Sequence, residues 1–183
     1  MKEIEVKILE INKEDIITKL ESIGAQKLEK ILIEDYFYDY PDNPIAAKNE
    51  ELRLRVINKK KATLTYKKNR EVKNDLKQMD EYETEISDYK TMNIILNALG
   101  LTAAANYAKE RITYKLNNTR FEIDTYAGIP TYLEIEAPTE TEVITAVELL
   151  GYKMENTTAL IAPEIFDMYK DKLKKPKNDE RGF

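Results

Sequence analysis

Near its start the chain alternates charged and apolar residues, in the stretch Glu3-Ile4-Glu5-Val6-Lys7-Ile8. Successive side chains of a β-strand point to opposite faces, so this stretch would carry three charges on one face and three apolar groups on the other. Charges recur at every second position in five further stretches, at Arg53 and Arg55, Glu81, Glu83 and Glu85, Lys109 and Arg111, Glu122 and Asp124, and Glu134 and Glu136. Six such strands indicate a charged surface gathered in one place; the alternative is six solvated faces on an open sheet.

Composition limits the chemistry that the chain can perform. Its 183 residues are 42% apolar and 34% charged, which suits one domain with a core of its own. It has no cysteine and no histidine, which excludes disulfides, thiolate or imidazole metal sites, and nucleophiles activated by histidine. Any metal must therefore be held by oxygen ligands, which points to Mg²⁺, Mn²⁺ or Ca²⁺.

Charge and hydropathy also limit the partners. The net charge of -5 gives no overall attraction to nucleic acid or to an anionic membrane. No apolar run approaches the roughly 20 residues of a membrane span, and Met1 leads into a strand without a signal-peptide pattern. We therefore expect a cytoplasmic protein, monomeric or homodimeric, that binds a small molecule and neither nucleic acid nor membrane.

Apolar periodicity predicts about eight strands and three or four helices. Strands are expected at about 2–11, 27–38, 51–58, 61–68, 80–87, 105–116, 119–126 and 132–137. Helices are expected at about 13–23, 88–99, 140–150 and 160–173. Residues 69–79 are polar without a period, which favours a mobile solvated loop, although its Arg70, Lys73 and Lys77 could fold over a site. We expect one domain over residues 1–173 and a disordered tail over 174–183.

Hairpin connections favour an antiparallel sheet whose apolar face lies under the helices, so the charged faces turn away from them. If the sheet closes into a barrel, the charges line its interior. Buried unpaired charges are costly, so such a lumen must be wet and largely self-compensating. Residues 81–85 and 134–136 are acidic, whereas residues 53–55 and 109–111 are basic. This arrangement suits a polyphosphate held by Arg and Lys and bridged to carboxylates by divalent metals.

As a set, these residues resemble the CYTH family, the triphosphate tunnel metalloenzymes, which includes class IV adenylyl cyclases, thiamine triphosphatases and inorganic tripolyphosphatases. The matching motifs are Glu3-x-Glu5-x-Lys7, Leu52-Arg53-Leu54-Arg55, Leu64-Thr65-Tyr66-Lys67, Glu81-x-Glu83-x-Glu85, Lys109-x-Arg111, and Asp124 followed by Tyr132-Leu133-Glu134-Ile135-Glu136. The resemblance covers nearly all of residues 1–155, in order.

The resemblance implies an α+β fold, a closed eight-stranded antiparallel β-barrel, or tunnel, with helices packed outside. It implies a bound triphosphate with Mg²⁺ or Mn²⁺. By resemblance, the phosphate ligands would be Arg53, Arg55, Lys67, Lys109 and Arg111. The metal ligands would be Glu3, Glu5, Asp124, Glu134 and Glu136. The catalytic set would be Lys7, which contacts phosphate or orients Glu5, and Glu83 and Glu85, which ligate metal or position water. For each residue alone, the alternative is a salt bridge inside the tunnel.

Three functions are compatible with this site. The leading hypothesis is metal-dependent hydrolysis of inorganic tripolyphosphate or of an organic or nucleoside triphosphate. The second is an adenylyl cyclase that converts ATP to cyclic AMP and pyrophosphate, and the third is a protein that binds polyphosphate or nucleotide without turnover. Many cyclase-like members end in a Ser-Tyr-x-x-Leu-Leu segment, whereas this region reads Thr157-Thr158-Ala159-Leu160-Ile161. Because of this difference, we rank hydrolysis above cyclisation.

Overall fold

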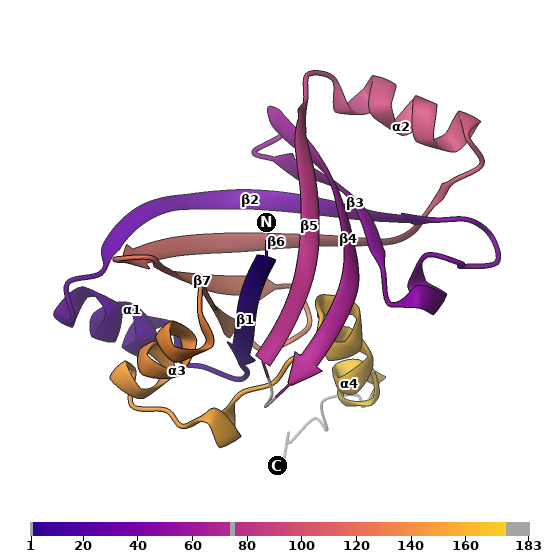
Figure 1. Ribbon diagram of the computed structural model, residues 1–183. Helices are drawn as coiled ribbons and strands as arrows, with labels where there is room; N and C mark the ends of the chain where they lie inside the picture. The colour runs from indigo at the N-terminus through magenta and orange to yellow at the C-terminus, as the bar shows by residue number, and fades with distance from the viewer. Residues whose placement is uncertain (1, 74–75, 175–183) are drawn as a thin grey trace, which may run out of the picture.

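The computed structural model describes the backbone of residues 2–73 and 76–174 and the side chains of residues 4–73 and 76–170. Eight antiparallel strands form a closed barrel in the order β1-β5-β4-β3-β2-β6-β7-β8 (Figure 1). The strands are β1 Lys2–Ile8, β2 Gln26–Asp39, β3 Glu51–Ile57, β4 Lys61–Lys73, β5 Leu76–Ile86, β6 Thr102–Leu116, β7 Thr119–Tyr126 and β8 Tyr132–Ala137. The predicted α+β fold with an eight-stranded barrel is confirmed.

Four α-helices lie outside the barrel, as predicted. They are α1 Lys13–Ser22, α2 Tyr89–Ala98, α3 Glu140–Leu149 and α4 Ala162–Lys174, accompanied by the short 3₁₀ helices η1 Ala46–Lys48 and η2 Met154–Asn156. α1 begins where the side chain of Asn12 accepts a hydrogen bond from the backbone N–H of Asp15 at 3.1 Å. Within the described residues, no helix has the length and apolar character that crossing a membrane requires. The predicted tail lies outside the described residues from residue 175 on.

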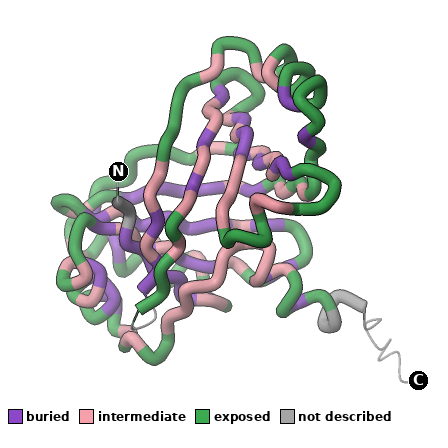
Figure 2. Tube along the Cα trace, turned by 45° about the vertical axis from the view of Figure 1, so that its right-hand side comes forward, coloured by how far each residue is buried: buried purple, intermediate pink, exposed green. Residues whose placement is uncertain are grey.

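The main hydrophobic core lies between the outer face of the barrel and the helices α1 and α3, which neighbour each other in Figure 1. Val6 and Ile8 of β1 point into this core, where they join Ile16 of α1 and Val147 of α3. Buried residues therefore follow the strands of the barrel, whereas most of α2 is exposed (Figure 2). Because Val6 and Ile8 face outward, the charged residues that alternate with them face the lumen.

The β4–β5 hairpin corrects the prediction of a mobile loop over residues 69–79. β4 continues to Lys73 and β5 begins at Leu76, with a register shift between Lys68 and Glu71. Residues 77–80 pair with β1, and Leu76 is buried in the main core. Pairing with β1 and burial of Leu76 outweigh the weak strand propensity of this polar segment. Strand propensity alone could therefore not predict the hairpin.

Candidate active site

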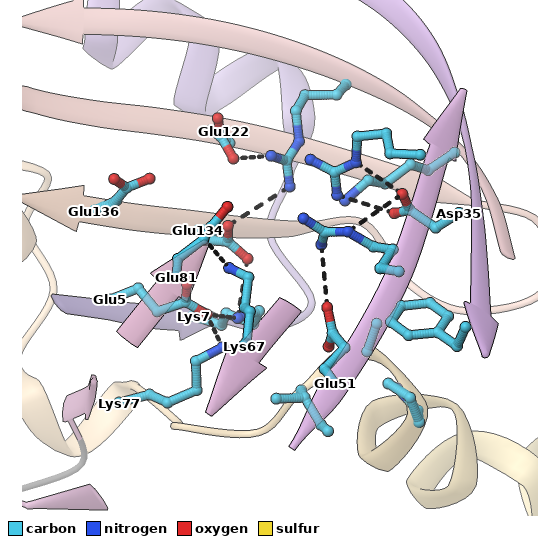
Figure 3. A pocket seen from close by; sticks show the side chains of 18 of the residues that line it. Glu5, Lys7, Asp35, Glu51, Lys67, Lys77, Glu81, Glu122, Glu134 and Glu136 are labelled. Atoms are coloured by element: carbon cyan, nitrogen blue, oxygen red, sulfur yellow. Dashed lines mark hydrogen bonds and ion pairs between the residues drawn. The ribbon is translucent and has the colours of Figure 1, made fainter. Parts of the chain in front are cut away.

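A cavity of about 290 Å³ occupies the barrel interior, and charged side chains from most strands point into it (Figure 3). Eight acidic residues line it: Glu5, Asp35, Glu51, Glu81, Glu83, Glu122, Glu134 and Glu136. Eight basic residues line it as well: Lys7, Arg53, Arg55, Lys67, Lys77, Lys109, Arg111 and Arg120. The lining therefore has a formal net charge of zero, which agrees with the expectation that the lumen compensates its own charges.

Strand register brings acidic residues of neighbouring strands face to face. Across the β1–β8 ladder Glu5 lies opposite Glu136, and across the β7–β8 ladder Glu122 lies opposite Glu134. Like charges directly opposite each other destabilise a sheet unless cations lie nearby. In this barrel, lysine and arginine side chains from neighbouring positions supply that compensation.

Two lysines hold Glu5 in the acidic wall. Its Oε1 accepts hydrogen bonds from Lys7 Nζ at 2.5 Å and contacts Lys77 Nζ at 2.7 Å. Lys7 also contacts Glu134 at 2.9 Å and thereby joins the two carboxylates. Burial and the nearby Glu134 raise the pKa of Glu5, but Lys7, Lys77 and Lys67 outweigh both and lower this pKa to about 2. Glu5 is therefore fully ionised at neutral pH.

The two arginines of β3 differ in how firmly they are held. Arg55 donates from Nε and Nη2 to the carboxylate of Asp35, at 2.7 and 3.0 Å. Burial raises the pKa of Asp35, but Arg55 and Arg53 outweigh burial and hold this pKa far below its ordinary value. Arg53 lies 3.8 Å from Asp35 and 3.5 Å from Glu51, and its Nε has no hydrogen-bond partner among the described residues. Arg53 thus retains donors for a ligand.

A buried carboxylate orients the two cations of β6. Asp124 is fully buried and accepts hydrogen bonds from Lys109 at 2.7 Å and from Arg111 Nε and Nη2 at 2.6 Å. Arg111 also pairs with Glu122 and lies 3.6 Å from Glu134. Both cations line the cavity, whereas Asp124 is not among the lining residues. Asp124 therefore stands behind Lys109 and Arg111 in this structure.

The acidic residues of β5 lie in different surroundings. Glu81 contacts Lys67 Nζ at 2.6 Å, and both residues line the cavity. Glu83 also lines the cavity and accepts a hydrogen bond from the hydroxyl of Thr65 at 2.7 Å. Glu83 and Glu85 are both exposed, but Glu85 is not among the lining residues. β5 therefore brings Glu81 and Glu83 to the lumen and leaves Glu85 outside it.

Most of the predicted site residues come together in this cavity. It gathers Glu5, Lys7, Arg53, Arg55, Lys67, Glu83, Lys109, Arg111, Glu134 and Glu136. The structure does not bring Asp124 or Glu85 to the lining, and the side chain of Glu3 lies outside the described residues. Sequence reasoning gave no site role to Asp35 or Arg120, and it placed Lys77 in a solvated loop that could fold over the site. Asp35 lies two residues from the lining residue Phe37, and Arg120 two residues from Glu122, so the alternation of side chains along a strand could have predicted both. Lys77 could not be predicted in this way, because its segment had been assigned to a loop.

The C-terminal segment closes part of the barrel wall. Where β1 runs past its pairing with β5, its Lys7 pairs with Thr158 instead. The backbone N–H of Lys7 donates to the carbonyl of Thr158 at 2.9 Å, and the N–H of Thr158 donates to the carbonyl of Lys7 at 2.8 Å. Arg70 binds both oxygens of Glu164 at 2.9 Å and the carbonyl of Ala159 at 3.2 Å. Residues 161–163 line the cavity. The segment therefore contacts the lumen, although its sequence differs from that of cyclase-like members.

The donor set suits a hard divalent cation. Glu5, Glu134 and Glu136 offer carboxylate oxygens to one lumen, the ligand type that Mg²⁺ and Mn²⁺ prefer. Oε1 of Glu5 already contacts two cations, the ammonium groups of Lys7 and Lys77. Among the described side chains, no three acidic residues form a ready-made metal cluster. A metal that uses Oε1 of Glu5 must therefore displace part of its lysine contacts.

The CYTH domain family model matches residues 1–160. A Methanocaldococcus jannaschii protein, provisionally named an adenylate cyclase, is 27% identical over 136 residues, which are 74% of this chain and 77% of that protein. A solved structure from Pyrococcus horikoshii is 30% identical, with a TM-score of 0.77, and covers 89% of this chain and 98% of its own.

A Hippeastrum protein shares the fold at 16% identity, with a TM-score of 0.67 over 95% of this chain and 100% of its own. It is provisionally named an adenylyl cyclase, and a dominant triphosphatase activity is described for it.

Proposed function

The chain belongs to the CYTH family, whose members are generally enzymes that depend on divalent metals, and on this premise we propose that it is a metal-dependent triphosphatase. Its substrate is inorganic tripolyphosphate or an organic or nucleoside triphosphate, bound inside the barrel. One observation carries the proposal, the cavity lined by eight acidic and eight basic side chains. The triphosphatase activity described for the Hippeastrum protein with this fold supports hydrolysis.

The neutral lining explains why metal and triphosphate belong together. A triphosphate brings several negative charges into a lumen whose own charges cancel, so the cations alone cannot neutralise it. Mg²⁺ or Mn²⁺, when bound, supplies the missing positive charge and polarises the phosphoryl oxygens. Glu5, Glu134 and Glu136 are the residues that would hold it, because their carboxylates share one lumen.

The basic residues bind and orient the phosphate chain. Arg53 is the first candidate because its guanidinium has only long contacts, at 3.5 and 3.8 Å. Lys109 and Arg111 are held by Asp124, so their orientation costs little when the ligand enters. Phosphoryl transfer requires mainly positioning and charge neutralisation; these fixed cations provide the positioning and, together with the metal, the neutralisation.

Hydrolysis also needs a residue that positions the attacking water. Glu83 lines the cavity, and its hydrogen bond from Thr65 at 2.7 Å fixes one of its oxygens. The other oxygen is the one that would accept a proton from water beside the terminal phosphorus. In this role Glu83 is the candidate base and Thr65 its positioning partner.

Cyclisation of ATP is the second candidate, favoured by the provisional name of the Methanocaldococcus jannaschii relative. It would use the same cations and metal ligands, but the attacking group would be the ribose 3′-oxygen at the α-phosphorus, with pyrophosphate as leaving group. The two reactions therefore differ in which phosphorus faces the nucleophile, and their products distinguish them.

A substrate panel tests the proposal. The purified protein is incubated with Mg²⁺ or Mn²⁺ and with tripolyphosphate, thiamine triphosphate or ATP, and phosphate and cyclic AMP are measured. Phosphate release supports hydrolysis, cyclic AMP supports cyclisation, and tight binding without product supports a binding protein. Glu5→Gln should lower kcat/KM by about 100-fold or more, while the exposed Glu148→Gln in α3 serves as the matched control. Unchanged activity in Glu5→Gln would refute the assignment of the site to this cavity.

A further inference from the structure

Lys77 is a buried cation at the acidic wall. It lies near the start of β5, is 7% exposed, and lines the cavity. In the β1–β5 ladder its Cα lies directly opposite that of Glu5, and its Nζ contacts Glu5 Oε1 at 2.7 Å. Figure 3 shows the Lys77 side chain reaching toward Glu5 and Lys7 from one side of the pocket.

The lysines keep the carboxylates from forming a metal site of their own. Oε1 of Glu5 already receives two ammonium groups, at 2.5 Å from Lys7 and 2.7 Å from Lys77. Lys7 lies between Glu5 and Glu134, with contacts of 2.5 and 2.9 Å. Accordingly, the described side chains contain no ready cluster of three acidic metal ligands. A divalent cation can take Oε1 of Glu5 only if at least one ammonium group leaves this oxygen.

Lys77 is the lysine that depends on Glu5 for its charge compensation. When Lys7 loses its contact with Glu5, it keeps Glu134 at 2.9 Å and a backbone bridge to Thr158 that anchors its strand. Among the described side chains, Lys77 forms its ion pair with Glu5. Once separated from Glu5, a buried ammonium needs another anion, and a triphosphate in the same cavity provides one.

We propose that Lys77 is a positioning residue that occupies the cation place at Glu5 in the ligand-free protein and moves to the phosphate chain when metal and triphosphate bind. The inference rests on the proposed function in that it takes a metal and a triphosphate as the ligands of this cavity. Metal removes the anion of Lys77, and triphosphate supplies a new one, so each ligand favours binding of the other. This coupling is reciprocal, as linkage requires.

Binding of each ligand alone tests the role of Lys77. Calorimetric titrations of chelator-treated protein would measure the Kd of Mn²⁺ without phosphate, and the Kd of a hydrolysis-resistant imido analogue of tripolyphosphate without metal. In Lys77→Met we expect Mn²⁺ to bind about tenfold more tightly and the analogue about tenfold more weakly. General damage to the site would weaken both ligands, whereas opposite signs show that the charge of Lys77 opposes the metal and supports the phosphate chain, as the exchange requires.

Two further variants complete the experiment. Lys61→Met removes one exposed charge from the same hairpin and should leave both constants within about twofold. Lys77→Arg keeps the charge, so the Kd values of Mn²⁺ and of the analogue should stay close to those of the wild type. If Lys77→Met fails to fold, Lys77→Gln replaces it. Unchanged or weaker Mn²⁺ binding in the uncharged variant would overturn the inference.

The two proposals fail separately. A wild-type protein that hydrolyses no triphosphate would overturn the proposed function, while the Mn²⁺ titrations would still decide the role of Lys77. A wild-type protein that hydrolyses triphosphate, with Mn²⁺ affinity unaffected by Lys77→Met, would overturn only the inference about Lys77.

Discussion

Arg53 and Arg55 are two residues apart on β3 and both line the cavity, yet their removal should have different consequences. Arg55 makes two short hydrogen bonds to the buried Asp35, whereas Arg53 has ion contacts of 3.5 and 3.8 Å. We therefore expect Arg55→Met to reduce mainly stability and Arg53→Met to reduce mainly substrate binding.

The magnitudes follow from these contacts. Arg55→Met leaves the buried carboxylate of Asp35 with only the more distant cations Arg53 and Lys109, so the free energy of unfolding should fall by about 3 kcal/mol, the lower end of the range for a broken buried pair. Arg53→Met should cost about 1 kcal/mol or less, because Asp35 keeps Arg55. Losing charge-assisted hydrogen bonds to phosphate should raise KM in Arg53→Met by about 10- to 100-fold.

Urea denaturation and steady-state kinetics on the preferred triphosphate would measure both effects. The double variant Asp35→Asn/Arg55→Met serves as control, because removing both charges should recover much of the stability that Arg55→Met loses. Equal stability losses in the two single variants, or an unchanged KM in Arg53→Met, would refute this division of roles.

Three further predictions concern acid, the C-terminal segment and the core. The pKa of Glu5 is lowered from 4.5 to about 2, so its stabilising contribution is complete above roughly pH 5 and is lost toward pH 2. Urea titrations should therefore show that the free energy of unfolding falls less steeply with acid in Glu5→Gln than in the wild type, and parallel curves would contradict this. Arg70→Met removes the contacts to Glu164 and should speed amide hydrogen exchange at Thr158 while leaving α1 unaffected; unchanged exchange would mean that the pair does not hold the segment. Phe121→Ala empties a fully buried position and should lower the free energy of unfolding by about 3–5 kcal/mol, and a loss below about 1 kcal/mol would be inconsistent with this core.

The barrel was predictable because one simple rule, alternation, holds along each strand. Glu5 and Lys7 face the lumen because Val6 and Ile8 face α1 and α3, and this parity is visible in the sequence. Closure into a barrel came from the family resemblance, since alternation alone is equally compatible with an open sheet.

Partners within the lumen were less predictable, because register decides them. Glu5 meets Lys77 only because β5 begins at Leu76, in a stretch whose composition favours a loop. Similarly, Asp124 has the parity of a lining residue, but Lys109 and Arg111 together enclose both of its oxygens. Sequence parity assigns a face of the sheet, whereas the depth of a side chain within a lumen depends on its neighbours.

The place of β1 in the barrel has a consequence for biogenesis. Of the eight strands β1 is synthesised first, yet its two neighbours are β5 and β8, and β8 ends only at Ala137. Until then the growing sheet has free edges, which are sites for pairing with other chains. Long-range closure of this kind slows folding, so the nascent protein must remain soluble as an open sheet. The rows of charged side chains that later line the lumen would keep the surface of this open sheet hydrated and so discourage aggregation on the ribosome.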